Sequence, residues 1–247
     1  MQAVILAGGL GTRLRPLTDT IPKAMVPVCG RPFLEYQIEL LARCGVKDLI
    51  ICLGHLGHMI EDHFGDGTKF GISIRYGRER HRLLGTAGAV KNVITMLRDA
   101  FFVVYGDSYA PVEFADVMAY FERHNRLGLM VVLRNEDRWD RSNVIVQDNL
   151  VAVYDKQQKL PGMDYIDHGV SLFRRKAFAF IPPGVVADLA VIHRHLVDRR
   201  ELLAYETTNR FYQIGTPEGL AEFEALVGAS EEPQHLLSSP PCTPANT

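Results

Sequence analysis

The chain has 247 residues, of which 47% are hydrophobic and 23% charged, an ordinary composition for a globular protein whose core needs no disulfide staples. Its formal net charge of −2 gives no general attraction to nucleic acid or to an anionic membrane, so neither is an expected partner. Any affinity for anions must therefore be local.

The four cysteines match no zinc or redox spacing and are predicted to be small buried residues in a reducing compartment. His193 and His195 are two positions apart and are predicted to lie on different sides of a helix as solvated or capping residues. The first residues lack the features of a signal peptide, and no apolar run is long enough to span a bilayer. These features predict a cytoplasmic protein.

Strand-like and helix-like segments alternate in the first half of the chain. Short apolar runs predict buried strands at 3–7, 48–53, 72–76, 101–107 and 129–133. Helical spacing of apolar residues predicts helices from Pro32 to Gly45, around Ile60, at 86–97 and at 113–126. This alternation predicts an α/β fold with a Rossmann-like, mostly parallel central sheet and helices on both of its faces.

The predicted strands come closer together after about residue 140, at 143–147, 150–154 and 165–173. A helix near 188–199, a strand near 202–206 and a helix from Pro217 to Val227 follow. No linker is visible, so residues 1–228 are predicted to form a single domain with halves at about 1–135 and 136–228. Residues 229–247 are rich in Ser, Pro and Thr and are predicted to be a disordered tail.

The stretch LAGGLGTRLRPLTDTIPKAMVPV, residues 6–28, leaves the carboxyl end of the first predicted strand, where ligands bind in open parallel sheets. Its three glycines let backbone N–H groups approach an anion, and Arg13 and Lys23 add positive charge. A P-loop is excluded because no Gly-Lys-Ser/Thr follows, and Leu14 replaces the third glycine of a dinucleotide fingerprint. Two prolines require an extended path, so the loop is long and wraps a ligand.

The same stretch resembles the signature of the sugar-1-phosphate nucleotidyltransferases, the enzymes that make nucleotide sugars. The matching residues are Gly8-Gly9-Leu10-Gly11-Thr12-Arg13-Leu14-x-Pro16-Leu17-Thr18 and Pro22-Lys23-x-Met25-x-Pro27-Val28. The resemblance covers about residues 1–227 and implies a GT-A-like fold. It implies that a nucleoside triphosphate and a sugar 1-phosphate give a nucleotide sugar and pyrophosphate, with Mg²⁺ as cofactor. The short chain looks most like heptose- or mannose-1-phosphate guanylyltransferases, with small uridylyltransferases close behind.

The resemblance assigns the first half of the chain to the nucleotide. It implies nucleotide binding by Leu6, Ala7, Gly8, Gly9, Gly11, Thr12, Arg13, Glu79, Gly85, Thr86 and Ala87. Glu79 can accept hydrogen bonds from a base edge, which suits the donors of guanine. Asp107 follows a buried strand, where a carboxylate can hold Mg²⁺ through oxygen. The resemblance implies that Asp107 is the metal ligand and is catalytic together with Arg13 and Lys23.

The second half of the chain is assigned to the sugar phosphate. The implied ligands are Asn143, Lys156, Asp167 and Gly169, with Lys156 on the phosphate. Gln213 stands where the family usually has a second carboxylate for the metal. Either Asp107, the phosphates and water suffice, or metal affinity is reduced, or catalysis is lost; a non-catalytic nucleotide-sugar-binding homologue is therefore the alternative. The base, the sugar and the oligomeric state, a homo-oligomer included, stay open.

Overall fold

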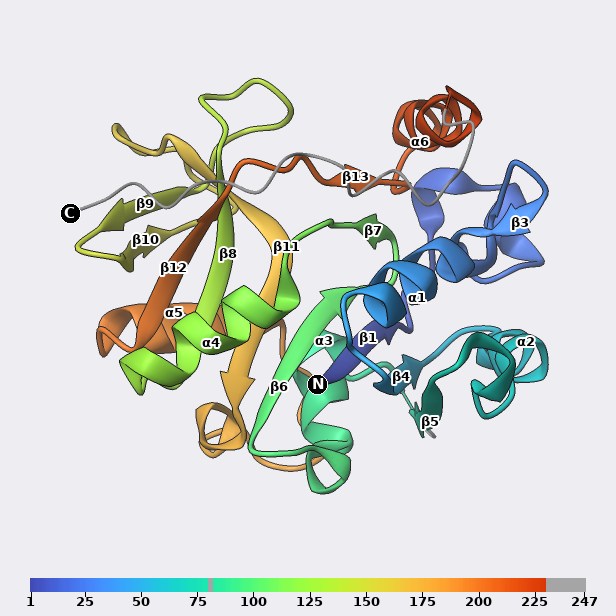
Figure 1. The fold of residues 1–247 in the computed structure, drawn as a ribbon, viewed down its shortest axis with the longest axis horizontal. Coiled ribbons are helices and arrows are strands. Elements are labelled where there is room, and N and C mark those ends of the chain that lie inside the picture. The colour runs from blue at the N-terminus through green and yellow to red at the C-terminus, as the bar shows by residue number, and fades with distance from the viewer. Residues whose placement is uncertain (80–81, 230–247) are drawn as a thin grey trace.

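A central sheet runs through both halves of the chain in the computed structural model, which describes residues 1–79 and 82–229 (Figure 1). The strands lie in the order β5-β4-β1-β6-β11-β8-β12-β10-β9. Their bounds are β1 Gln2–Ala7, β4 Asp48–Leu53, β5 Ser73–Arg78, β6 Ala100–Tyr105, β8 Gly128–Arg134, β9 Val144–Gln147, β10 Leu150–Tyr154, β11 Tyr165–Arg174 and β12 Leu202–Thr207. Among the described residues no helix has the length and apolar character needed to cross a membrane.

Strands β5, β4, β1 and β6 are parallel, as predicted, because a connection that contains a helix links each of them to the next in the chain. The prediction of a mostly parallel sheet is wrong for the second half. There β11 runs antiparallel to β6 and β8, and β10 runs antiparallel to β12 and β9. Strand β9 also pairs with β11, which closes β11-β8-β12-β10-β9 into a small barrel.

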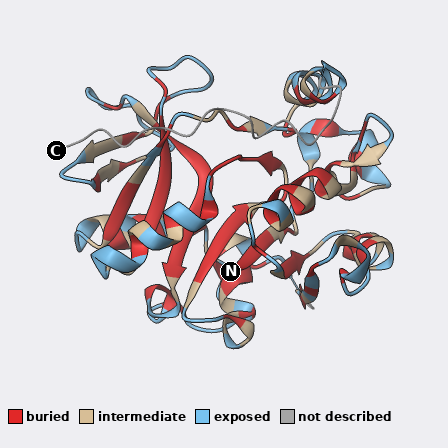
Figure 2. Ribbon diagram, in the orientation of Figure 1, coloured by how far each residue is buried: buried red, intermediate tan, exposed pale blue. Residues whose placement is uncertain are grey.

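Helices cover both faces of the sheet, as predicted (Figure 2). On one face lie α1 (Phe33–Arg43), α2 (Gly57–Phe64) and α4 (Phe114–His124), and on the other α3 (Gly85–Asn92) and α5 (Leu189–Asp198). Helix α1 begins directly after Pro32 and buries Leu34, Ile38 and Leu41 at helical spacing.

Helix α6 (Pro217–Ala229) packs against α1 through Phe223, whose ring centre lies 5.0 Å from that of Phe33. This contact closes the last segment of the domain back onto the first helix. Ala229 belongs to α6, and residues 230–247, predicted to be a tail, lie outside the described residues.

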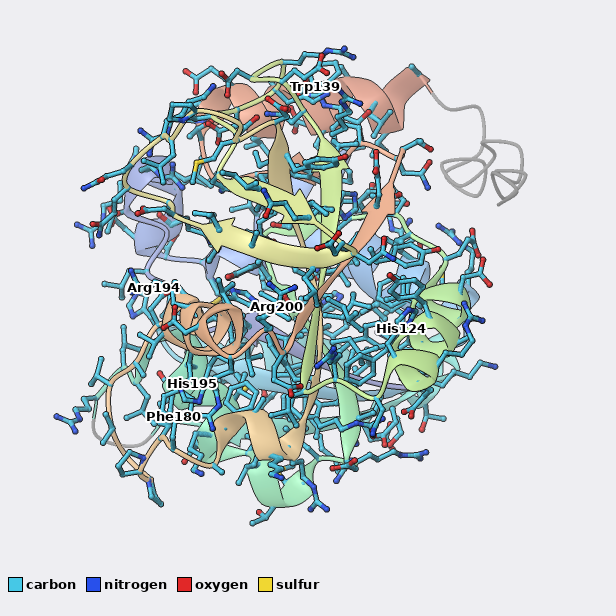
Figure 3. All side chains as sticks on the ribbon, turned by 90° about the vertical axis from the view of Figure 1, so that its left-hand side faces the viewer. His124, Trp139, Phe180, Arg194, His195 and Arg200 are labelled. Atoms are coloured by element: carbon cyan, nitrogen blue, oxygen red, sulfur yellow. The ribbon has the colours of Figure 1, made fainter. Side chains whose placement is uncertain are left out.

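Two predictions about single residue types need correction. Cys52 is buried, but Cys29 is exposed because it lies with Gly30 in the turn between β2 (Pro27–Val28) and β3 (Arg31–Pro32). His193 and His195 do lie on different sides of α5, but His193 is fully buried, so its predicted solvation is wrong. His195 stacks on the exposed Phe180 with ring centres 4.0 Å apart (Figure 3).

Candidate active site

A first hollow of about 260 Å³ lies at the carboxyl ends of β1 and β6, where the sequence predicts a nucleotide. Of the predicted nucleotide-binding residues, its wall includes Leu6, Ala7, Gly8, Gly9, Gly11, Glu79, Gly85 and Thr86. Thr12 is exposed outside this wall, and Ala87 is buried, with its N–H donating to the carbonyl of Ala187 at 2.9 Å. The predicted residues thus converge on one place, except for these two and Arg13.

The glycines of the loop allow close backbone packing. Gly11 has a φ of +63°, and a Cβ on it would lie 2.9 Å from Cγ2 of Thr18. A Cβ on Gly54 would lie 2.4 Å from the carbonyl oxygen of Gly8, so the loop after β1 and the end of β4 touch backbone to backbone. Five glycines, Gly8, Gly9, Gly11, Gly85 and Gly106, belong to the wall of the first hollow, where backbone can offer N–H donors to an anion.

Lys23 and Asp107 form an ion pair at the edge of the first hollow. Lys23 opens a 3-10 turn after Pro22, and Asp107 follows β6 and Gly106. Gly106 donates its N–H to the carbonyl of Leu6 at 3.0 Å, and a Cβ on it would lie 2.9 Å from that oxygen. This contact holds the end of β6 against the end of β1, so the predicted lysine and carboxylate meet.

Arg13 lies next to Lys23 but outside the wall of the first hollow. A Cβ added to Gly215 would lie 3.0 Å from Nη2 of Arg13 and 3.2 Å from Nζ of Lys23. The two positive groups therefore lie side by side against Gly215, which follows β13 (Tyr212–Gln213). Because Gly215 has no side chain, both groups can lie close to its backbone. Such a pair can neutralise charge on two neighbouring phosphates.

Glu79 lies in the wall of the first hollow, as predicted, and also holds its own loop. Its Oε1 accepts a hydrogen bond from the N–H of Leu84 at 3.1 Å, just before α3 begins. Burial raises the pKa of Glu79, and the hydrogen bond from Leu84 opposes that shift. Oε2 is the carboxylate atom that can accept from a base edge.

A second hollow of about 350 Å³ holds the predicted sugar-phosphate residues. Its wall includes Asn143, Lys156, Asp167 and Gly169, and Gln213 as well. In contrast to the first hollow, this wall consists mainly of polar and charged side chains. The structure thus brings together residues from three separate segments that the resemblance assigned to one ligand, and Gln213 from a fourth.

Asp167 is nearly buried and its carboxylate already has partners. Oδ2 accepts from the hydroxyl of Tyr154 at 3.0 Å and lies 3.7 Å from Nζ of Lys156, and Oδ1 accepts from the N–H of Gly169 at 3.0 Å. Burial alone would raise the pKa of Asp167, but Lys156 and these hydrogen bonds outweigh it, so the pKa is lowered. Asp167 therefore stays ionised and can fix the groups around it.

Gln213 lies beside Asp107, as the resemblance implies for the second metal position. It pairs with Ser108 where β13 meets β7 (Ser108–Tyr109), and the N–H of Ile214 donates to the carbonyl of Asp107 at 3.0 Å. The described residues contain no group of three or more His, Cys, Asp or Glu that can hold a metal. A carboxylate and an amide oxygen suit Mg²⁺, which completes its shell with phosphate oxygens and water.

Five residues of the second hollow were not predicted from the sequence: Tyr105, Asp140, Arg141, Ile166 and Phe211. Tyr105 ends β6 and is the one described residue that lines both hollows; its place before Gly106-Asp107 at a strand end was the available signal. Arg141 donates to the carbonyls of Lys156 and Gln157 at 2.6 and 3.0 Å, which holds the loop after β10. No sequence signal marked that contact.

A third hollow of about 500 Å³ adjoins the second one and shares Gln213 with it. It reaches Arg13 and the half-exposed Trp139, which lies at the end of the molecule near α6 (Figure 3). Trp139 packs on the guanidinium of Arg210, whose Cζ is 3.6 Å from the ring centre. Arg13 and Gln213 of this wall were singled out in the sequence, whereas Trp139 and Arg210 were not.

Comparison with known proteins identifies the family. The sequence model of the family "Nucleotidyl transferase" matches residues 2–226. The chain therefore belongs to the nucleotidyl transferase family, which confirms the resemblance seen in residues 8–28.

Several curated relatives are sugar-1-phosphate nucleotidyltransferases. The chain is 31% identical to the N-acetylmuramate alpha-1-phosphate uridylyltransferase of Neisseria meningitidis serogroup B, over 93% of this chain and 99% of that one. It is 34% identical to the mannose-1-phosphate guanylyltransferase of Mycobacterium tuberculosis, over 88% of this chain and 62% of that one. It is 32% identical to the D-glycero-alpha-D-manno-heptose 1-phosphate guanylyltransferase of Campylobacter jejuni, over 72% of this chain and 78% of that one.

Solved structures share the fold. HddC from Yersinia pseudotuberculosis, complexed with GMP-PN, has a TM-score of 0.74 and 26% identity over 90% of this chain and 96% of that one. The UDP-glucose pyrophosphorylase from Acinetobacter baumanii has a TM-score of 0.76 over 92% of this chain and 93% of that one. At 19% identity, this likeness shows the fold alone.

Proposed function

We propose that the protein transfers a nucleotidyl group from a nucleoside triphosphate to a sugar 1-phosphate and releases pyrophosphate. The observation that carries this proposal is the meeting of two hollows at Tyr105, one lined in part by the glycine loop after β1 and one mainly by polar and charged side chains. The Lys23–Asp107 pair stands at the edge of the first. Such an arrangement can present two phosphate-bearing substrates to each other.

In the proposed step, a phosphate oxygen of the sugar 1-phosphate attacks the α-phosphorus of the triphosphate in line. The bond between that phosphorus and the leaving pyrophosphate oxygen breaks at the same time, so no covalent enzyme intermediate is required. Arg13 and Lys23 would neutralise the leaving pyrophosphate, and Lys156 would orient the incoming phosphate. Asp107 and Gln213 would hold Mg²⁺, which supplies further charge neutralisation when bound.

Within this reaction class we infer guanylyl transfer to a hexose or heptose 1-phosphate. Two of the relatives named above are guanylyltransferases for such sugars, and the Yersinia neighbour is complexed with GMP-PN. Oε2 of Glu79 offers an acceptor in the first hollow, and guanine presents N–H donors on its base-pairing edge. Uridylyl transfer is the second candidate, because the Neisseria relative, matched over 99% of its length, is a uridylyltransferase.

The test is a pyrophosphate-release screen that crosses GTP, UTP, dTTP and ATP with mannose, heptose, glucose and N-acetylmuramate 1-phosphates in the presence of Mg²⁺. Release with one pair, abolished by Asp107→Ala, would establish the reaction and name both substrates. Release with UTP and not GTP would replace guanylyl with uridylyl transfer. No release with any pair, while a nucleotide sugar still binds by calorimetry, would favour the non-catalytic homologue that Gln213 suggests.

A further inference from the structure

The ammonium group of Lys156 lies among three side chains that come from three different strands. Its Nζ is 5.4 Å from the ring centre of Tyr105 at the end of β6 and 5.7 Å from that of Tyr154 at the end of β10. It is also 3.7 Å from Oδ2 of Asp167 in β11. The side chain of Lys156 is 44% exposed, so this cage is open on one side.

The walls of this cage are themselves fixed. Tyr154 is buried, and its hydroxyl donates to Asp167 at 3.0 Å. The carbonyl of Tyr105 accepts from Nε2 of Gln37 at 2.8 Å, which anchors the end of β6 to α1. Burial, followed by the nearby Asp167, raises the pKa of both tyrosines above the ordinary value, so both rings stay neutral phenols.

We propose that Tyr105 and Tyr154 are positioning residues that hold the Lys156 ammonium, by cation–π attraction, at the place where the acceptor phosphate binds. Both ring distances lie within the range over which a ring face attracts a cation. A free lysine side chain loses rotamer freedom when it binds a phosphate, and one that is already held loses less. The role as acceptor site rests on the proposed function; the cage itself does not.

Tyr105 gives this cage its place in the reaction. It is the one described residue that lines both hollows, so its ring keeps the ammonium at the boundary between the two substrates. Gly169, with a φ of +90°, faces the same ring, and a Cβ there would lie 3.9 Å from Cδ2 of Tyr105.

The cage can be tested without turnover by ¹³C-methyl NMR of the reductively methylated protein. Inorganic phosphate is the ligand for the binding measurements described next. Lys156→Arg identifies the Lys156 signal. We expect that signal to be shifted upfield by the two rings, and Tyr105→Leu to move it toward the position of a free lysine. A Lys156 signal already at the free-lysine position in the unsubstituted protein would overturn the proposal.

A series of ring substitutions at Tyr105 can separate cation–π attraction to Lys156 from simple packing of the ring. Replacing Tyr105 by phenylalanine and then by phenylalanines with one, two and three ring fluorines weakens the ring's pull on a cation with little change in size. We expect the phosphate Kd to rise stepwise, by about three- to fivefold in all. The same series at Tyr120 of α4, whose ring packs on Tyr205 of β12, is the matched control and should show no trend. A flat series at Tyr105 would refute the cation–π role.

The outcomes also separate this proposal from the proposed function. Loss of phosphate affinity along the series, together with no pyrophosphate release from any sugar 1-phosphate, would refute the reaction and support the cage. Pyrophosphate release with a flat phosphate series would support the reaction and refute the cage. Where both hold, KM for the sugar 1-phosphate should rise along the series while kcat changes less than about twofold, as expected for loss of uniform binding.

Discussion

The two hollows are built from different parts of the protein. The first includes the glycine loop after β1, whose glycines bring main-chain atoms together where side chains would collide. The second is walled by residues from five separate segments, and Asp167 contacts two of the others through Asn143 and Lys156. A backbone site needs one contiguous stretch of sequence and is recognisable as a motif, whereas a side-chain site is spread along the chain.

The sheet shows the same contrast. Around β1 the strands are parallel and end at one edge, which gives a row of strand ends for phosphates. In the second half antiparallel pairing turns β11 against β6, so that Tyr105 and Asp167 arrive at the same place from strands that run in opposite directions. The junction of the two hollows, where we propose that the reaction occurs, is therefore the seam between the parallel and antiparallel parts of the sheet.

The largest expected effect comes from a substitution of Asp107 at that seam. Asp107→Asn keeps the size of the side chain but removes the charge that faces Lys23. We expect kcat to fall on the order of 10²–10³-fold, the usual cost of losing one preorganised electrostatic group. Steady-state pyrophosphate release measures the loss, and Asp116→Asn on the exposed surface of α4 is the matched control. A loss below tenfold would place the chemistry elsewhere.

The second prediction concerns how the free energy of unfolding depends on pH. This dependence should come mainly from residues in the second half of the chain. Burial lowers the pKa of His168 and of His193 to about 4, whereas none of the histidines described in residues 1–135 is buried. Below pH 6.5 these two imidazoles become protonated in the unfolded chain but stay neutral in the folded protein until the pH approaches 4. The free energy of unfolding therefore falls as the pH drops from 6.5 toward 4. Each buried histidine contributes about 2 kcal/mol to the fall between pH 7 and pH 5.

Urea unfolding at several pH values measures this slope. His193→Gln should remove about half of the fall in the free energy of unfolding, and His58→Gln, at an exposed position of α2, should leave the fall unchanged. Asp167 acts in a different window, since its lowered pKa adds stability that is lost only below about pH 4. An unchanged slope in His193→Gln would show that the buried imidazole titrates normally.

The first half of the fold could be predicted almost completely from the sequence. The strand at 48–53 is observed at those bounds, and most other elements differ by only a few residues, because each strand there is a short apolar run between turn residues. The mixed second half was not foreseen, although Asp148 and Asn149, both with positive φ, are a typical hairpin turn between β9 and β10. Strand direction depends on such turns and not on apolar runs.

The candidate site divides in the same way. Gly8, Gly11 and Lys23 were located by a contiguous motif, and the structure places them in one wall. Tyr105 was missed, although it stands before Gly106-Asp107 at a strand end, because its contact with Lys156 joins segments far apart in the chain. Arg141 was missed because no local pattern distinguishes it from a surface arginine. His193 was misjudged because its burial depends on α5 packing against the sheet, which its neighbours in sequence do not reveal.

A third prediction tests the bare backbone at Gly215, which lines the third hollow and lies against Arg13 and Lys23. In Gly215→Ala the new Cβ would lie 3.0 Å from Arg13 and 3.2 Å from Lys23, so both charged groups must shift. We expect kcat/KM for the triphosphate to fall about tenfold, since a misplacement of 1 Å costs about 10²-fold and these flexible ends can yield part of the way. The melting temperature should stay within about 2 °C of the unsubstituted protein.

The control for this change is Gly228→Ala in α6, where a Cβ would meet no atom within 4 Å. It should leave kcat/KM unchanged. If Gly215→Ala also has no effect, Arg13 and Lys23 do not need their present separation, and the contribution of bare backbone to this site is smaller than the geometry indicates.

The smallest expected effect comes from Gln213, which belongs to the second hollow but lies beside Asp107 of the first. Gln213→Glu introduces the carboxylate that the family resemblance leads one to expect, and a carboxylate is the stronger ligand for a hard cation. We expect the Mg²⁺ concentration at half-maximal activity to fall about threefold, because phosphates and water already supply most of the shell. Gln158→Glu, on the exposed loop after β10, controls for added charge and should not shift that concentration. A shift in Mg²⁺ dependence with an unchanged KM for the sugar 1-phosphate would mean that Gln213 serves the metal; the reverse would mean that it serves the sugar, and the two hollows would then be chemically separate.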